Sequence, residues 1–342
     1  MTRWSVRLFL VVVCVMAFPY RSPAPLIYRP GEGWVYEKPG EVGSWQRTRA
    51  KDQLEVAQQA FDAKDFGLSM KASQRTVRVW PLSDYAPQAQ YLVGRCYEAQ
   101  GFEQKAFKHY QELLQKYPKT DKYEEVLKRQ LAIAHRKLGV EYVYGVTGAL
   151  EQATSTSFAF PSFSTIFFKR LSTVEMYENI VKNGPYSEVG PIAQMNIGAA
   201  HEKKKDYPDA VKAYQRAADR YADRPDILGD ATFKTGIAYN KQARTAEYDQ
   251  TIASKAIETF SDFSTLHPDD KRAPDALKRI ESLRTEQSRG AFETAKFYEK
   301  RNKPLAAKIY YNEALNKDPG SVYAEIARLR IEDLNRRSGT NQ

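Results

Sequence analysis

Residues 86–118 read APQAQYLVGRCYEAQGFEQKAFKHYQELLQKYP, and this stretch decides the fold. Offsets of 3, 9, 4, 3 and 5 residues separate the members of a series of small and large side chains: Gly94, Tyr97, Ala106, Tyr110, Leu113 and Pro118. Small residues let two helices approach closely, a ring fills the space between them, and proline stops the second helix. The stretch therefore predicts two helices that pack against each other as a pair.

The same series recurs along the chain, which indicates a repeat. Two copies keep its register: Gly198, His201, Ala210, Tyr214, Ala217, and Ala295, Tyr298, Ala307, Tyr311, Ala314, Pro319. A fourth copy has eight extra residues around Thr245 to Thr251 between its helices: Gly236, Tyr239, Ala256, Phe260, Phe263, Pro268. A weaker first copy consists of Ala57, Ala60, Ser69, Ser73, Thr76 and Pro81. This spacing is that of the tetratricopeptide repeat (TPR), so we predict an all-α TPR superhelix, or α-solenoid, of about six helix-turn-helix repeats.

One copy is interrupted by an aromatic insertion. Its first helix contains Ala132 and His135, but its second helix, with Tyr177, begins only after an insertion of about 29 residues between Gly139 and Leu171. The insertion holds several large apolar side chains: Tyr142, Tyr144, Phe158, Phe160, Phe163, Phe167 and Phe168. Exposed apolar surface is normally small unless it meets a partner or a membrane. Two interpretations stay open: the insertion folds back on its own repeat, or its five phenylalanines contact a partner or a membrane surface.

The N-terminal segment is typical of an export signal. Arg3 and Arg7 precede a short apolar run from Leu8 to Phe18, and a small-residue cleavage position follows after Ala17 or Ala24. We do not expect lipidation at Cys14, because valine stands before it where a lipidation signal needs a small residue. The predicted organisation is an export signal (1–24), a Pro/Gly-rich linker (25–44), N-terminal repeats (45–138), the aromatic insertion (139–170), C-terminal repeats (171–335) and a tail (336–342).

Charge and cysteine content narrow the classes of partner. The formal net charge is +10, but lysines and arginines are spread over nearly every predicted helix and mixed with acids, which is typical of solvated helix faces. An exported protein rarely meets nucleic acid, so we expect no nucleic-acid partner. Removal of the export signal leaves Cys96 as the one thiol, so stability must come from packing rather than from disulfides.

Catalytic and metal-binding patterns are absent from the sequence. The four histidines, at positions 109, 135, 201 and 267, lie far apart and match no zinc spacing. His201 takes a place where sister copies have tyrosine, which favours a packing role. The sequence contains no nucleophile elbow, phosphate-binding loop or dinucleotide fingerprint. We therefore expect no enzyme activity, no cofactor and no metal ion.

A peptide-binding groove is the functional expectation. The first helix of each repeat lines the concave side of a TPR superhelix. On the first two repeats this face presents a mixed set of aromatic, apolar and hydrogen-bonding side chains: Leu54, Gln58, Phe61, Gln88, Tyr91, Arg95 and Glu98. Such a wall suits an extended peptide or its terminal carboxylate, with Arg95 as the anion partner.

Several segments resemble a known family. Residues 51–138 resemble the start of the BamD (ComL-like) family of outer-membrane-protein assembly factors. The stronger match is Tyr248-Asp249-Gln250, followed by KAIETFSDF at 255–263 and by His267-Pro268, which resembles the family's third repeat. Residues 279–284 and 295–301 look like the helices that lead into the fourth repeat.

The resemblance implies a periplasmic scaffold at the inner face of the outer membrane. Its groove would bind unfolded outer-membrane proteins or their signal peptides, and its C-terminal end would contact an outer-membrane assembly protein of the BamA type. This chain departs from the pattern in having about two additional repeats, at 123–221, and a single helix, 322–335, in place of the last repeat. A binding module of another cell-envelope pathway is the alternative.

Overall fold

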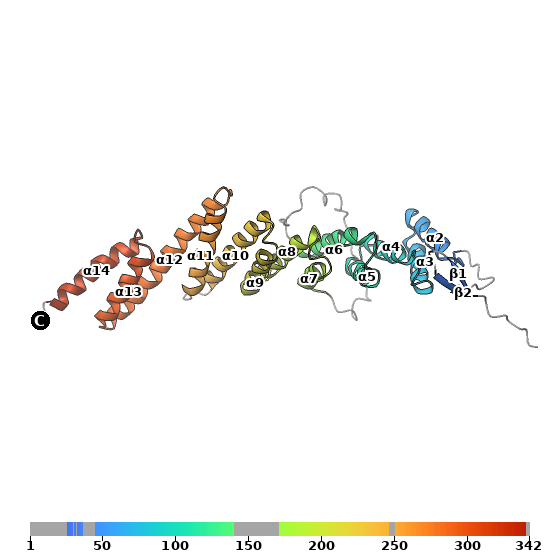
Figure 1. The fold of residues 1–342 in the computed structure, drawn as a ribbon. Coiled ribbons are helices and arrows are strands. Elements are labelled where there is room, and N and C mark those ends of the chain that lie inside the picture. The colour runs from blue at the N-terminus through green and yellow to red at the C-terminus, as the bar shows by residue number, and fades with distance from the viewer. Residues whose placement is uncertain are drawn as a thin grey trace, which may run out of the picture. The chain divides into compact units, whose positions relative to one another are not determined.

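The computed structural model describes residues 26–29, 31, 33–36, 45–139, 171–245 and 250–339. Within these ranges lie 13 helices and one two-stranded sheet (Figure 1). The chain divides into two compact units inside helix α6 (Tyr123–Leu138): unit 1 holds the described residues up to Val126, and unit 2 holds those from Leu127 onward. The five phenylalanines of the insertion (Phe158, Phe160, Phe163, Phe167 and Phe168) lie outside the described residues, as does the export segment.

Consecutive helices form the pairs that the sequence predicts. Unit 1 contains α2 (Ala50–Asp62), α3 (Phe66–Val79), α4 (Ala86–Ala99) and α5 (Glu103–Lys116). Unit 2 continues α6 with α7 (Thr173–Asn183), α8 (Val189–Lys203), α9 (Tyr207–Arg220), α10 (Pro225–Thr245), α11 (Gln250–Leu266), α12 (Ala273–Lys300), α13 (Pro304–Lys317) and α14 (Val322–Gly339). Each helix packs on the next within its unit (Figure 1). The described helices thus make six consecutive helix pairs and one final helix, and the predicted all-α TPR class is confirmed.

Small residues lie directly against rings of the partner helix, as the spacing predicts. A Cβ atom added at Gly94 would lie 2.4 Å from Cε1 of Tyr110, and one added at Gly198 would lie 2.4 Å from Cε1 of Tyr214. At Gly236 the corresponding distance, to the phenylalanine ring opposite, is 2.7 Å. Because interiors are close-packed, the helices of these pairs can lie this close together only while the position has no side chain.

Four of the turns inside the pairs share one backbone conformation. Four turn residues have positive φ, at 60°, 77°, 61° and 57°: Lys64, Gly101, Lys205 and Asn302. Each lies seven residues after the small residue of its copy of the series. A lysine or asparagine in this left-handed region costs about 1 kcal/mol or more, which the packed helix pair has to offset. The shared turn shows that the four copies have the same register in three dimensions.

Helix α12 departs from the expected division into two helices. Its 28 residues contain both the 279–284 and the 295–301 segments. Its first half packs in a cluster with α10 and α11 that includes Phe260 and Ile280, and its second half packs with α13 and α14 around Tyr311. These two clusters of unit 2 therefore share one continuous helix. None of the described helices is both long and apolar enough to cross a membrane.

Part of the predicted linker forms a β-hairpin. Strand β1 (Leu26–Arg29) pairs antiparallel with β2 (Gly33–Tyr36), and Leu26 faces Tyr36 in the register. Gly31 and Gly33 have φ of +82° and +78°, a region that glycine adopts without strain. The backbone N–H of Asp84 donates to the carbonyl of Gly31 over 2.7 Å. The sequence predicted a Pro/Gly-rich linker at 25–44, and this part of it is a strand pair that is hydrogen-bonded to unit 1 just before α4.

Candidate functional site

The predicted groove residues of α2 and α4 meet across the boundary between their helices. Nε2 of Gln88 donates to Oε1 of Gln58 over 3.2 Å. The guanidinium carbon of Arg95 lies 5.3 Å from the ring centroid of Phe61 and 5.8 Å from that of Tyr91. The structure therefore brings five of the seven residues into contacts between or within helices α2 and α4 of unit 1.

Arg95 is held in place by aromatic side chains. Its Nη1 donates to the hydroxyl of Tyr91 over 3.1 Å, and its guanidinium lies over two rings. Cation–π contacts keep the charge of a guanidinium while they restrict its rotamers. Its planar fork carries five N–H donors, more than this one bond uses, and matches the two oxygens of a carboxylate. The guanidinium of this half-buried arginine is thus restrained, and it has N–H donors beyond the one that bonds to Tyr91.

Tyr91 connects the face to a third helix. Its hydroxyl donates a short hydrogen bond to Oε1 of Glu125, in α6, and its ring lies 6.1 Å from that of Tyr110. The side chain is only 7% exposed, so it presents an edge rather than a whole ring. Sequence reasoning missed Glu125, because the stacking of α6 beside α4 rather than any local pattern brings it to the hydroxyl.

Two of the predicted groove residues are engaged inside unit 1. Leu54 is 7% exposed and belongs to the core cluster with Ala57 and Leu92. Oε2 of Glu98 accepts a hydrogen bond from the hydroxyl of Tyr110 over 2.6 Å. Both side chains contribute to the packing of the helix pairs. The part of the predicted groove that remains available to a ligand therefore consists mainly of the two glutamines, Phe61 and Arg95.

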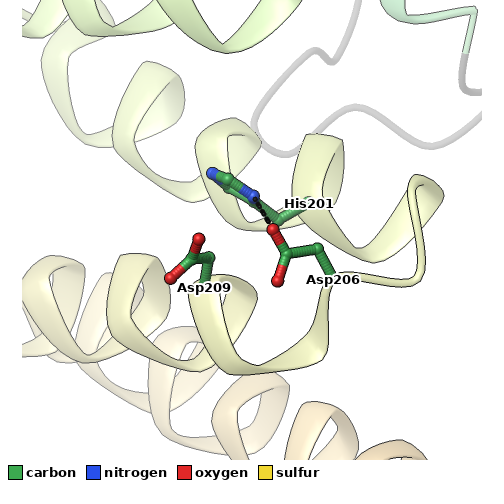
Figure 2. A group of neighbouring side chains, drawn as sticks. All are labelled: His201, Asp206 and Asp209. Carbon is green, nitrogen blue, oxygen red and sulfur yellow. Dashed lines mark hydrogen bonds and ion pairs between the residues drawn. The ribbon is translucent and has the colours of Figure 1, made fainter.

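A cluster of one histidine and two aspartates lies at the turn between α8 and α9 (Figure 2). His201, Asp206 and Asp209 each have a possible ligand atom, and these three atoms lie within 4.8 Å of one another. Among the described residues, this is the group that is close enough together to hold a metal ion. Nδ1 of His201 lies 3.2 Å from Oδ2 of Asp206, and Oδ1 of Asp209 accepts from Nζ of Lys212 over 2.8 Å.

Protein partners account for this cluster without an ion. The ammonium of Lys212 beside Asp209, through its hydrogen bond and its charge, holds the pKa of that carboxyl below its usual range. Both aspartates lie at the start of α9, where the helix dipole favours anions over cations. The side chain of His201, expected to serve in packing, is 17% exposed, and its Nδ1 also lies within hydrogen-bonding distance of Asp206. The contact depends on the left-handed turn at Lys205, which the sequence pattern did not indicate.

The pair α6/α7 contains buried polar groups that lack partners. The hydroxyl of Tyr177 and Nδ1 of His135 are buried without a hydrogen bond, and the two rings lie 5.6 Å apart. Nε2 of His135 lies 3.4 Å from Nδ2 of Asn196. Burial lowers the pKa of His135 to about 4, and the nearby charge of Arg136 adds to the effect, so the ring is neutral at physiological pH.

Comparisons with solved structures return TPR proteins. The C-terminal part of a TPR protein from Cytophaga hutchinsonii is 12% identical, with a TM-score of 0.34, over 82% of this chain and 87% of that one. A TPR protein from Parabacteroides merdae is 12% identical, with a TM-score of 0.28, over 83% of this chain and 98% of that one. PilW, a type IV pilus biogenesis factor, is 12% identical, with a TM-score of 0.25, over 82% and 99%. No curated protein sequence matches the chain.

Family models give more specific matches. A TPR model matches residues 88–120, which span α4, α5 and the face that carries Arg95. The model of YfiO, described as an outer membrane lipoprotein, matches residues 170–342, the whole of unit 2 from just before α7. The match covers half of the chain and includes the BamD-like segments at 248–268, 279–284 and 295–301, but not the one at 51–138. The chain therefore belongs to the YfiO family of outer membrane lipoproteins.

Proposed function

We propose that this protein is a scaffold at the periplasmic face of the outer membrane that binds segments of unfolded barrel proteins. The observation that carries the proposal is the contact of Phe61, Tyr91 and Arg95 across α2 and α4, beside the pair Gln58–Gln88. Membership of the YfiO family and the TPR match support a role in holding polypeptides rather than in catalysis.

The side chains of this face suit an extended peptide. Amide groups such as those of Gln58 and Gln88 both donate and accept, so they can pair with the N–H and C=O groups of a peptide backbone. Phe61 offers a ring surface for an apolar side chain, and Arg95 offers a charged fork for a carboxylate. A peptide with an apolar residue close to a free C-terminus satisfies all three kinds of group.

Location at the outer membrane rests on the family and on the N-terminal sequence. The family is one of outer membrane lipoproteins, and residues 1–24 are typical of an export signal. Whether Cys14 carries the lipid is decided by the mass of the mature N-terminus. A diacylated cysteine at position 14 would overturn our expectation that lipidation does not occur there, and an N-terminus at Phe18 or Pro25 would support it.

Peptide titration tests the groove directly. A fluorescent peptide with the C-terminal sequence of a barrel protein is titrated with the mature chain, with its carboxylate either free or amidated. We expect Arg95→Ala to weaken binding of the free carboxylate about tenfold, since a charge-assisted hydrogen bond is lost. Amidation should weaken binding to the wild type by a similar factor, and it should leave binding to the variant unchanged.

Arg216, an exposed arginine of α9, provides the control. Arg216→Ala removes the same charge and should leave the affinity unchanged. Equal affinities of the wild type and Arg95→Ala for the free carboxylate would argue against a groove on α2 and α4.

The assembly partner requires a separate experiment. The proposal expects an outer-membrane assembly protein of the BamA type to copurify from detergent-solubilised outer membranes. Depletion of the chain should also lower the levels of barrel proteins. Unaltered levels would favour the alternative, a TPR binding module of another cell-envelope pathway.

A further inference from the structure

The hairpin carries a pair of exposed aromatic side chains. Tyr28 and Trp34 face each other across β1 and β2, with ring centroids 5.5 Å apart and an interplanar angle of 64°. Tyr28 is 62% exposed and Trp34 is 68% exposed. Cross-strand aromatic pairs stabilise hairpins, but a pair with this much exposed area also leaves apolar surface in contact with water.

The hairpin is fixed to the helices that it precedes. The carbonyl of Gly31 accepts the backbone N–H of Asp84 over 2.7 Å, and a Cβ atom added at Gly31 would lie 3.2 Å from Oδ2 of Asp84 and 3.7 Å from the ring of Tyr85. The aromatic pair is thus attached to the start of α4 rather than to a free arm. Whatever binds the pair therefore also restrains unit 1.

We propose that Tyr28 and Trp34 contact the interfacial region of a phospholipid bilayer. This inference rests on the proposed location at the outer membrane. Both side chains combine an apolar ring with a polar N–H or O–H group, the chemistry that enriches tryptophan and tyrosine at membrane–water interfaces. Among the other large exposed apolar residues that the structure describes, Tyr186 alone carries such a polar group. Leu305 and Ile309 of α13, for example, are aliphatic.

The position of the pair in the chain favours the same occupant. The apolar N-terminal run ends at Phe18, eight residues before Leu26, and eight extended residues span at most about 29 Å. Any attachment of the N-terminal segment to a membrane would hold the hairpin within that distance of the surface. Two aromatic side chains alone bind a bilayer only marginally, so the contact supplements such an attachment.

A tethered chain tests the contact. A chain that starts at Cys14, and so keeps residues that the expected cleavage after Ala17 or Ala24 removes, is coupled through that cysteine to a maleimide phospholipid. The vesicles are zwitterionic phosphatidylcholine, which limits attraction by the basic surface. Cys96 is 0% exposed, and burial raises the pKa of its thiol, so coupling is selective for Cys14. Phosphatidylcholine with brominated acyl chains then quenches tryptophans that reach the bilayer.

Trp34 is the reporter in this experiment. Trp80 is only 5% exposed and Trp45 packs against the core of α2, so their emission should be insensitive to brominated lipid. We expect quenching of the wild type, its loss in Trp34→Phe, and a weaker effect in Tyr28→Ser. Tyr186→Ser removes a tyrosine that is 89% exposed in unit 2 and should leave the quenching unchanged.

Two results would overturn the inference: a wild type that is quenched no more than Trp34→Phe, or equal quenching of the wild type and Tyr28→Ser. Tyr28→Phe keeps the ring and removes the hydroxyl, so quenching that phenylalanine retains and serine loses would show that the ring rather than the hydroxyl is required. Binding of barrel peptides involves α2 and α4 and is measured without vesicles. Its failure would therefore count against the proposed function and leave this result intact.

Discussion

Two helix pairs of unit 2 each bury a tyrosine at the same place in the repeat, but only one of the two hydroxyls has a hydrogen-bond partner. In α8/α9, Tyr214 is 1% exposed and donates to Oε1 of Glu202 over 2.6 Å. In α6/α7, Tyr177 is 0% exposed and its hydroxyl has no partner. Burial raises the pKa of both hydroxyls, so both stay protonated at physiological pH. The difference between the pairs is therefore one hydrogen bond.

The sequence explains which pairs have the bond. It joins residues twelve apart, over 2.6 Å each time: Glu98 and Tyr110, Glu202 and Tyr214, Glu299 and Tyr311. Each glutamate lies four residues after the small residue of its copy of the series. At this place α6 has Arg136 and α10 has Asn240, and the ring opposite in α11 is Phe260, which has no hydroxyl. Residues at the two places thus match each other in four of the six pairs. They do not match in α6/α7, or in α2/α3, where Phe61 and Ser73 take the two places and the Ser73 hydroxyl is buried without a partner.

The largest effect that we expect concerns His135, the second buried group without a full set of partners in α6/α7. Its pKa of about 4 in the folded chain lies below the usual 6.5, so the unfolded chain binds more protons between these values. The contribution of His135 to the free energy of unfolding is therefore fully present above pH 6.5. It falls as the pH drops toward 4, by up to about 3 kcal/mol. Urea denaturation of the mature chain at several pH values measures this loss.

His135→Gln provides the comparison for that titration. Glutamine stays neutral, so the variant should lose less stability between pH 6.5 and 4 than the wild type. His109 also has a lowered pKa, mainly through burial, and contributes in the same direction to both proteins. Identical pH profiles of wild type and variant would show that His135 is not buried as described.

The next effect tests the hydrogen bond itself. Tyr214→Phe removes the donor from Glu202, whose side chain is 11% exposed and keeps only Lys241 as its partner. Hydrogen bonds to charged groups contribute about 1.5–3 kcal/mol, so we expect a loss of about 2 kcal/mol. Hydrogen exchange of the α8 and α9 amides checks this locally, because the stability of repeat proteins is distributed along the chain. Unchanged exchange would mean that the bond adds no net stability.

Register, more than composition, made the fold predictable. The series around Gly94 and Gly198 located the helix pairs, and the extra residues after Gly236 are accounted for by the long α10 and the 246–249 segment. The strands β1 and β2 were not predicted, because four-residue runs carry too little periodicity. The continuous α12 was not predicted either, because its two periodic halves look like two helices in the sequence. No proline separates these halves, so the helix continues through both of them.

At the candidate groove, the helical spacing of the sequence predicted which residues lie on one face, but not which residues from other helices or turns form hydrogen bonds with them. Helical spacing alone placed Phe61 and Arg95 on one face, and the structure brings them into contact. Glu125 and Asp206 could not be found in this way. The first depends on how α6 stacks beside α4, and the second depends on a left-handed turn.

A transplant of the Tyr–Glu pair into α10/α11 sharpens the comparison further. Phe260→Tyr alone places a hydroxyl in a buried site opposite Asn240, and we expect a cost of about 1 kcal/mol or more. Adding Asn240→Glu restores the combination found in three other pairs and should recover most of that loss. A double-mutant cycle measures the coupling between the two positions. Strictly additive effects would show that the recurrence of the pair does not reflect an energetic coupling.

The smallest effect is the most direct test of the comparison. Tyr177→Phe removes a hydroxyl that has no partner, so no bond is lost and a buried polar group disappears. Since an unsatisfied buried group costs about 1–3 kcal/mol and the small cavity left behind offsets part of the gain, we expect a change between zero and about +1 kcal/mol. The sign is opposite to that expected for Tyr214→Phe, although the chemical change is the same. Hydrogen exchange in α6 and α7 measures it, and a loss of stability comparable to that of Tyr214→Phe would show that Tyr177 has a partner after all.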